Sequence, residues 1–223
     1  MRSPPSFPFA GQSWYALPQG ALVWRERAAL IVADLHFEKA SAYARRGQML
    51  PPYDSQVTLD GLEALVDLLA PREIWCLGDS FHDGHAADRM DAVTRARLAR
   101  LTARCRWTWI TGNHDPAPAP GLGGETIDEA HIDGVILRHE ARAGEIQPEI
   151  SGHFHPKWRL SLRGRSVSRR CFVMGERKLI IPAFGALTGG LDAAAAPIRA
   201  LIGHGGEALV PLSDRLLRFA VPA

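Results

Sequence analysis

The sequence predicts an α/β fold with a parallel or mixed sheet, and two observations lead to this prediction. Short apolar runs, which are typical of buried strands, alternate with helical patterns along the chain. Several of these runs are followed at once by aspartate, asparagine or histidine. The clearest run is 74–77, which is bounded by Pro71 and Arg72 on one side and by Gly78 on the other. The next residue, Asp79, then lies at the rim of the sheet, where open α/β sheets bind ligands.

The chain up to residue 70 predicts two strands and two helices. Residues 21–33 are expected to form two short strands, joined by a tight polar connection at residues 25–27. Residues 37–46 and 54–70 have helical patterns, and a Pro-Pro pair at 51–52 separates them. In the second helix we expect Asp54 as N-cap and an apolar stripe of Val57, Leu62, Leu65, Val66 and Leu69.

The middle of the chain continues the alternation of strands and helices. After the strand at 74–77, a helix is expected from about residue 89 to residue 103. Strands are then expected at 107–110, 134–137 and 149–151. Three prolines exclude a regular helix after the first of these strands and predict a loop over the sheet rim, namely Pro116, Pro118 and Pro120.

The last third of the chain predicts antiparallel strands and one flexible segment. The strands are expected at 158–162, 171–174, 178–181 and 216–220. Residues 189–206 are rich in alanine and glycine, and this composition predicts a flexible loop or insertion.

Length and composition predict a single domain that spans residues 1–223. A chain of 223 residues with 46% hydrophobic residues can bury one sizeable core. No apolar run is long enough to span a membrane, and the N-terminus lacks the apolar stretch of a signal peptide. We therefore expect a cytoplasmic protein without membrane association. The 3 cysteines form no CxxC pair, so neither a disulfide framework nor a thiolate zinc site is indicated.

The formal charge of +2 is too small to indicate a polyanionic partner, but basic residues are clustered. Such clusters are typical of surfaces that bind a phosphate backbone, although a solvated arginine-rich face gives the same pattern. The first cluster is Arg95, Arg97, Arg100, Arg104 and Arg106. The second is Lys157, Arg159, Arg163, Arg165, Arg169, Arg170, Arg177 and Lys178, with Glu176 as its one acid.

Five expected strand ends finish in motifs that can supply metal ligands. They are Asp-x-His at 34–36, Gly-Asp at 78–79, Gly-Asn-His-Asp at 112–115, a single histidine at 139 and Gly-His-x-His at 152–155. In extended backbone, residues i and i+2 project to the same face, so Asp34 and His36 are expected to reach one ion. Oxygen and imidazole donors suit Mn²⁺, Fe²⁺ or Zn²⁺. There are enough donors for two ions roughly 3.5–4 Å apart with a bridging carboxylate.

The order of these motifs resembles that of the calcineurin-like metallophosphoesterases over residues 34–155. The resemblance implies a four-layered αββα sandwich with a dimetal site at the rim of the inner sheets. It also implies a dinuclear phosphoesterase whose ions are Mn²⁺, with Fe²⁺ or Zn²⁺ as alternatives. The implied ligands are Asp34, His36 and His155 for the first ion, Asp79 as the bridge, and Asn113, His139 and His153 for the second.

The resemblance does not imply that His114 is a metal ligand. Adjacent residues in extended backbone point to opposite sides, so His114 is expected to face the substrate when Asn113 faces the metal. There it would act as a general acid or as a donor to the phosphate. The implied reaction is attack by a metal-bound hydroxide on phosphorus, without a covalent enzyme intermediate.

His82, three residues after the expected bridge, separates two branches of the family. Phosphoprotein phosphatases of the family carry aspartate at this position, whereas Gly-Asp-x-Phe-His resembles the repair nucleases. A second imidazole near the scissile phosphate fits diester cleavage, because an alkoxide leaving group needs a proton. The runs at 34–40, 78–83 and 152–156 resemble most closely the bacterial ligase-associated, PdeM-like branch of the family.

This branch implies a Mn²⁺-dependent DNA endonuclease or phosphodiesterase in DNA repair, with a ligase, a helicase and an exonuclease-like protein as companions. The expected partner is single-stranded or unpaired DNA, because no groove-reading motif is present. The basic stretch after residue 156 would form part of the DNA path. A small-molecule phosphatase or cyclic-nucleotide phosphodiesterase is the alternative, and a non-catalytic module on the same fold is a further one.

Overall fold

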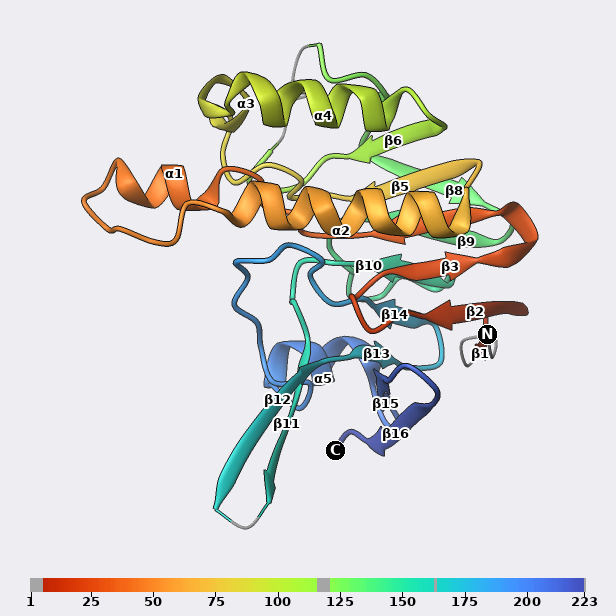
Figure 1. Ribbon diagram of the computed structural model, residues 1–223. Helices are drawn as coiled ribbons and strands as arrows, with labels where there is room; N and C mark the ends of the chain where they lie inside the picture. Colours follow the sequence, from red (N-terminus) through yellow and green to blue (C-terminus); the bar gives the residue numbers. More distant parts are fainter. Residues whose placement is uncertain (1–5, 116–120, 163, 223) are drawn as a thin grey trace.

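Two seven-stranded sheets with helices on both outer faces make up the structure (Figure 1). This computed structural model describes residues 6–115, 121–162 and 164–222. Pro116, Pro118, Pro120 and Arg163, on which the sequence makes predictions, lie outside these ranges. The predicted α/β class and the four-layered αββα sandwich are confirmed.

The first sheet contains the strands that lead to the Asp-x-His, Gly-Asp and Gly-Asn-His-Asp motifs. Its strands β4, β5, β6 and β7 are parallel, and β1 to β4 are antiparallel neighbours. Val32 pairs with Cys76, and Leu77 pairs with Ile110, so these strands end at one level. In order across the sheet, the strands are β1 (Ser6–Phe9), β2 (Gln12–Ala16), β3 (Leu22–Trp24), β4 (Ala29–Val32), β5 (Glu73–Leu77), β6 (Arg106–Ile110) and β7 (Glu125–Ile127).

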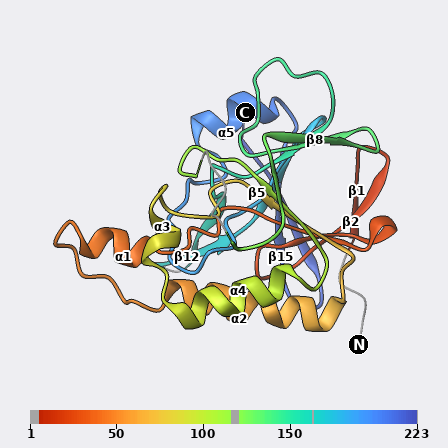
Figure 2. The ribbon, with the colours of Figure 1, turned by 90° about the horizontal axis from the view of Figure 1, so that it is seen from above.

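Helices α2 (Asp54–Leu69) and α4 (Ala92–Thr102) cover the outer face of the first sheet (Figure 2). The shorter helices are α1 (Lys39–Ala44) and α3 (Ala86–Arg89). The helix predicted from about residue 89 to residue 103 is present as α4, but it begins at Ala92, because Met90 is extended and the Asp91 side chain caps the helix by accepting from Val93 N and Thr94 N.

Two predictions for α2 are wrong. Asp54 is its first residue and not its N-cap, because its carboxylate accepts from Ala40 N at 2.9 Å and joins α1 to α2. Val57 is 53% exposed, whereas Leu59 is fully buried in its place. The rest of the predicted stripe packs against the sheet.

The second sheet supplies the other two motifs from parallel neighbours. Strands β9, β10 and β14 are parallel, so β14 is not purely antiparallel as the sequence predicts. The apolar faces of the two sheets pack against each other in the central core. In order across this sheet, the strands are β16 (Leu216–Ala220), β15 (Glu207–Pro211), β13 (Phe172–Met174), β14 (Lys178–Ile180), β10 (Glu149–Ser151), β9 (Val135–Arg138) and β8 (Glu129–Ile132).

The predicted flexible segment at 189–206 instead contains helix α5 (Ala196–Ile202). Ile198 and Ile202, four residues apart, are buried and pack on the outer face of the second sheet. The prediction fails because the composition hides this short apolar stripe. Among the described residues, no helix has the length and apolar character needed to span a membrane.

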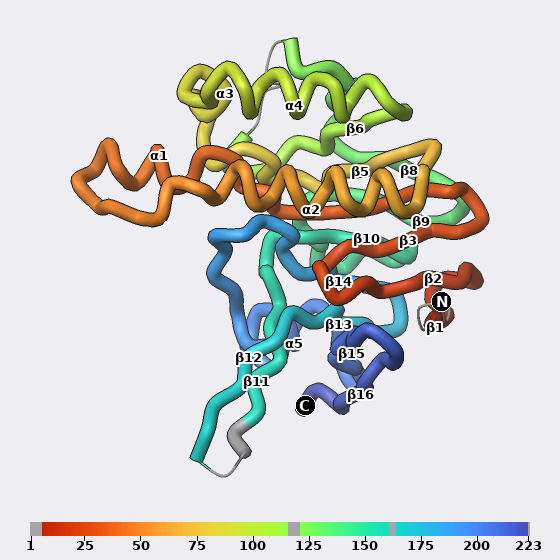
Figure 3. Tube along the Cα trace, in the orientation of Figure 1, coloured from red at the N-terminus to blue at the C-terminus, as the bar shows by residue number. Residues whose placement is uncertain are grey.

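Strands β11 (Lys157–Leu162) and β12 (Arg165–Arg170) form a separate two-stranded antiparallel hairpin. It starts directly after the Gly-His-x-His motif and extends away from the body of the molecule (Figures 1 and 3). The hairpin therefore carries much of the second basic cluster out from the strand ends.

Candidate dimetal site

The backbone at three of the five motifs is left-handed at the predicted ligands and not extended as expected from the sequence. Asp34 has φ 54°, His36 has φ 47° and Asp79 has φ 49°. His153 and His155 have φ 68° and 48°. Non-glycine residues adopt this conformation at a cost, and such strain is found preferentially at functional sites.

Hydrogen bonds between the two segments that follow β4 and β5 bring their side chains together. Asp34 N donates to Gly78 O at 3.1 Å, and His36 N donates to Asp79 O at 2.9 Å. The two segments thus continue side by side beyond the sheet. The Asp-x-His motif converges on the Gly-Asp motif through these bonds and through the left-handed turns.

Asp34, His36 and His155 form a first group of donors. His155 Nε2 lies 3.3 Å from Asp34 Oδ1 and 3.4 Å from His36 Nε2. Burial, followed by the charge of His155, lowers the pKa of His36 to about 2. The His36 imidazole is therefore neutral near neutral pH, which is the form that binds metal ions.

Asn113, His139 and His153 form a second group. Asn113 Oδ1 lies 2.9 Å from His139 Nε2 and 3.0 Å from His153 Nδ1, and these two ring nitrogens are 3.1 Å apart. The other ring nitrogen of His139, Nδ1, donates to the Leu77 carbonyl at 3.0 Å. Nε2 therefore keeps its lone pair and faces another acceptor, the Asn113 oxygen. Two acceptors this close repel each other, and a shared cation removes the conflict, so this group fits a metal ion.

The Asp79 carboxylate lies between the two groups. Its Oδ2 is 3.9 Å from His36 Nε2, and its Oδ1 is 3.5 Å from His139 Nε2. Each oxygen thus faces one group, which is the arrangement of a bridging ligand. The structure brings all seven predicted ligands together, in the grouping that the resemblance implies.

Two glycines of the motifs allow the carboxylates to approach the backbone closely. A Cβ at Gly112 would collide with the Asp79 carboxylate, and a Cβ at Gly152 would collide with that of Asp34. These collisions explain why each motif has a residue without a side chain beside a buried aspartate.

His114 and His82 lie together beside the donor groups. Their rings stack with centroids 5.1 Å apart, and His114 Nδ1 donates to the His82 carbonyl at 2.7 Å. His114 Nε2 is the ring nitrogen that this bond leaves available, and it lies 3.9 Å from Asp79 Oδ2. The His114 side chain is 38% exposed.

His82 is buried, and among the described residues its Nδ1 has no hydrogen-bond partner. Burial, followed by the charge of His114, lowers the pKa of His82 to about 4. His82 is therefore a neutral imidazole near neutral pH. Together with His36 and His114 it forms a third group close enough to hold an ion.

Three further side chains at the site were not identified in the sequence. After burial and His155, the charge of Lys39 contributes to the lowered pKa of His36, so its ammonium group lies near the first group. Tyr43 places its ring 5.7 Å from the His82 ring. Glu140 Oε1 lies 3.6 Å from His153 Nε2, on the side of the ring away from Asn113. The available signals were the position of Glu140 directly after a predicted ligand and that of Lys39 within the run at 34–40.

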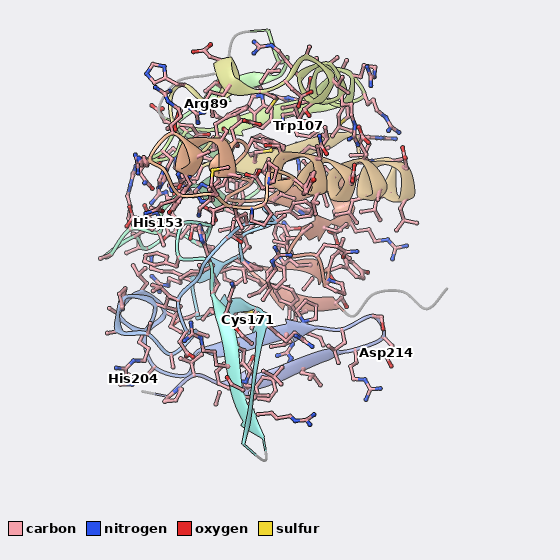
Figure 4. The ribbon with its side chains drawn as sticks, turned by 60° about the vertical axis from the view of Figure 1, so that its left-hand side comes forward. Arg89, Trp107, His153, Cys171, His204 and Asp214 are labelled. Carbon is pink, nitrogen blue, oxygen red and sulfur yellow. The ribbon has the colours of Figure 1, made fainter. Side chains whose placement is uncertain are left out.

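The donor groups lie at one edge of the two sheets. In Figure 4, the label of His153 stands at the left of the molecule, below that of Arg89, which ends α3, and above that of Cys171, which follows the β11–β12 hairpin. This edge is formed by the carboxyl ends of the parallel strands of both sheets. The position matches the predicted rim of the inner sheets.

The fold and the paired donor groups define a dinuclear metal-dependent phosphoesterase. The model of the calcineurin-like phosphoesterase family matches residues 29–206, and the chain belongs to this family. Both groups of side chains fit divalent ions.

Among solved structures, the chain is similar to the crystal structure of the nuclease MPE from Pseudomonas putida. The TM-score is 0.74 and the sequence identity is 28%, over 96% of this chain and 99% of that chain. A protein of unknown function from Aquifex aeolicus matches with a TM-score of 0.41 and 17% identity, over 61% of this chain and 81% of that one. No curated protein matches the chain significantly.

Proposed function

We propose that this phosphoesterase is a DNA endonuclease that cleaves single-stranded or unpaired DNA with two Mn²⁺ ions. The observation that carries the proposal is the imidazole pair of His82 and His114 beside the donor groups. The similarity to the nuclease MPE over nearly the whole of both chains supports it. A role in DNA repair is part of the proposal and rests on the resemblance to the ligase-associated branch.

The donor groups bind and orient the scissile phosphate in this proposal. When bound, the divalent ions supply Lewis-acid polarisation of the phosphate and a water molecule of lowered pKa. Asp34, His36 and His155 would hold one ion, Asn113, His139 and His153 would hold the other, and Asp79 would contribute a ligand to both. The Leu77 carbonyl fixes His139 in the tautomer that binds metal.

The imidazole pair controls the proton of the leaving oxygen. His114 Nδ1 is held by the His82 carbonyl, so Nε2 is the atom that can hold or deliver a proton at the exposed side of the site. His82 stacks on this ring and fixes its orientation. A deoxyribose oxygen is a poor leaving group without a proton, and a phosphodiester backbone therefore needs this assistance more than an activated aryl ester does.

Incubation of the Mn²⁺-loaded protein with circular single-stranded DNA tests the proposal. Linear molecules followed by shorter fragments are expected, because only an endonuclease can open a circle. The Asp79→Asn protein serves as the control for contaminating nucleases. Circles that stay intact while the same preparation hydrolyses bis(p-nitrophenyl) phosphate would contradict DNA cleavage and support a small-molecule phosphodiesterase.

A further inference from the structure

A groove of about 560 Å³ lies at the base of the β11–β12 hairpin. Ladder pairing places Lys157 directly opposite Arg170, so both side chains lie on one face of the hairpin. This face lines the groove together with Arg169 and hydroxyl side chains from three segments. The full lining is Pro18, Lys157, Ser168, Arg169, Arg170, Ala186, Thr188, Pro211, Leu212 and Ser213.

The positive charges of this groove are not neutralised by carboxylates in the described part of the chain. Lys157 Nζ donates to the Thr188 carbonyl at 3.1 Å, and the exposed Arg169 donates to the Ser168 carbonyl at 3.3 Å. Arg170 donates to carbonyl oxygens, the shortest bond being 2.7 Å to Gly185. Carbonyl groups orient these cations but leave their net charge in place, so the groove favours an anionic ligand.

The groove is joined to the candidate dimetal site by a short series of hydrogen bonds. Lys157 lies two residues after His155 and bonds to Thr188. Thr188 Oγ1 donates to the Gly185 carbonyl at 3.0 Å, and Gly185 N donates to Asp34 O at 3.2 Å. The wall of the groove is thus continuous with the backbone that carries the first donor group.

Phosphate backbones are bound by this combination of side chains. Lysine and arginine side chains, serine and threonine hydroxyls and backbone N–H groups make most contacts between proteins and nucleic acid phosphates. Three cations and three hydroxyl residues line this groove. The proline and leucine side chains of Pro18, Pro211 and Leu212 give apolar surface for sugars.

We propose that this groove binds backbone phosphates of the single-stranded DNA, beside the phosphate that is cleaved at the dimetal site. This inference rests on the proposed function and adds the surface that guides the strand. Binding releases counterions from the DNA, so each phosphate contact steepens the dependence of cleavage on salt concentration.

The test compares two double variants, one in the groove and one outside it, and in each of them two basic residues are replaced by glutamine. Lys157→Gln/Arg169→Gln removes two cations of the groove, and Arg169→Gln alone removes the exposed one. Arg104→Gln/Arg106→Gln is the matched control, because these two side chains are 46% and 59% exposed and lie just after α4, the second at the start of β6. Thermal unfolding and Mn²⁺ binding of each full-length protein show whether fold and metal site are intact.

The measured quantity is kcat/KM for cleavage of a labelled single-stranded oligonucleotide by the Mn²⁺-loaded proteins, at about 50 to 200 mM salt. Each lost contact should make the slope of log(kcat/KM) against log[salt] shallower by roughly 0.7, so the groove double variant changes it by about 1.4. At about 0.1 M salt this corresponds to a loss of roughly 25-fold. The control variant should keep the parent slope.

A groove variant that keeps the parent slope and rate, while the parent cleaves DNA, overturns this inference and leaves the proposed function standing. The inference is also overturned if kcat/KM of the Arg104→Gln/Arg106→Gln control falls as much as that of the groove variant, because the effect would then follow from the total charge of the protein. A parent protein that leaves the oligonucleotide intact contradicts the proposed function itself, and this inference with it.

Discussion

The two basic clusters look alike in the sequence but differ in the structure. In the first cluster, Arg97 on α4 pairs with Asp60 and Glu63 of α2. Arg104, just after α4, pairs with Asp67 of α2. Arg106 pairs with Glu125 of β7. In the hairpin cluster, Arg159 reaches one carboxylate, Asp192, at 4.0 Å, and the cations of the groove bond to carbonyl oxygens.

This difference shows what a run of basic residues can indicate. Arg97 on α4 and Arg104 just after it stabilise the contact with α2, because acids of α2 lie opposite them. Part of the second cluster is structural as well, since Lys178 is buried in an ion pair with Glu149. The charge available to a polyanion is therefore concentrated at the hairpin, and the following changes test that distinction.

The largest effect is expected at the dimetal site, because cleavage requires this site whichever basic cluster binds the DNA. Asp79→Asn removes one negative charge from the expected bridge and should lower hydrolysis of DNA and of bis(p-nitrophenyl) phosphate by on the order of 1000-fold, because several kcal/mol of charge stabilisation are lost. Steady-state rates on both substrates, with Mn²⁺ content measured in parallel, check this. Retained activity would show that the site lies elsewhere.

The His82→Ala variant tests whether the imidazole pair contributes to selectivity for DNA. DNA cleavage should fall by about 100-fold, because the ring that stacks on the proton-donating His114 is lost while the bond to the main-chain carbonyl of residue 82 remains. Hydrolysis of bis(p-nitrophenyl) phosphate should fall much less, since nitrophenolate leaves without a proton. Comparison of kcat/KM for the two substrates checks this split. An equal loss on both would reduce His82 to a structural support.

Charge reversal compares the two clusters directly. Arg169→Glu changes the charge of the groove by two units and should lower kcat/KM on single-stranded DNA by roughly 25-fold at about 0.1 M salt. Arg104→Glu places a like charge beside Asp67 and should lower stability by less than about 1 kcal/mol, with DNA cleavage unchanged. Kinetics and urea unfolding of both proteins would reveal the opposite pattern if α4 were the DNA-binding surface.

Arg97→Met is expected to change stability alone. It removes the ion pairs with Asp60 and Glu63 and should lower the free energy of unfolding by about 1 kcal/mol. Cleavage of DNA should keep its parent rate and salt slope. Urea unfolding and the oligonucleotide assay measure the two quantities, and a reduced salt slope would assign a phosphate contact to α4.

Motif order in the sequence was sufficient to predict the fold class and the residues that converge at the rim. Five strand ends with polar side chains can meet only if parallel strands end at one edge, and β4, β5 and β6 of one sheet and β9 and β10 of the other do so. The reason given for Asp34 and His36 was wrong, because left-handed turns rather than extended backbone aim them.

Features that depend on partners distant in the sequence could not be predicted. The acids of α2 that neutralise the α4 arginines lie 34 to 37 residues earlier in the chain. The alanine-rich segment around α5 is ordered because Ile198 and Ile202 pack on the outer face of the second sheet. Lys39 follows the Asp-x-His motif in sequence, but only the structure places its charge beside His36 and His82.

Anomalous diffraction from crystals grown with Mn²⁺ tests the dimetal assignment most directly. Two peaks are expected, one against Asp34, His36 and His155 and the other against Asn113, His139 and His153, with Asp79 between them. A single ion held by His36, His82 and His114, the third group of donors, would contradict the assignment.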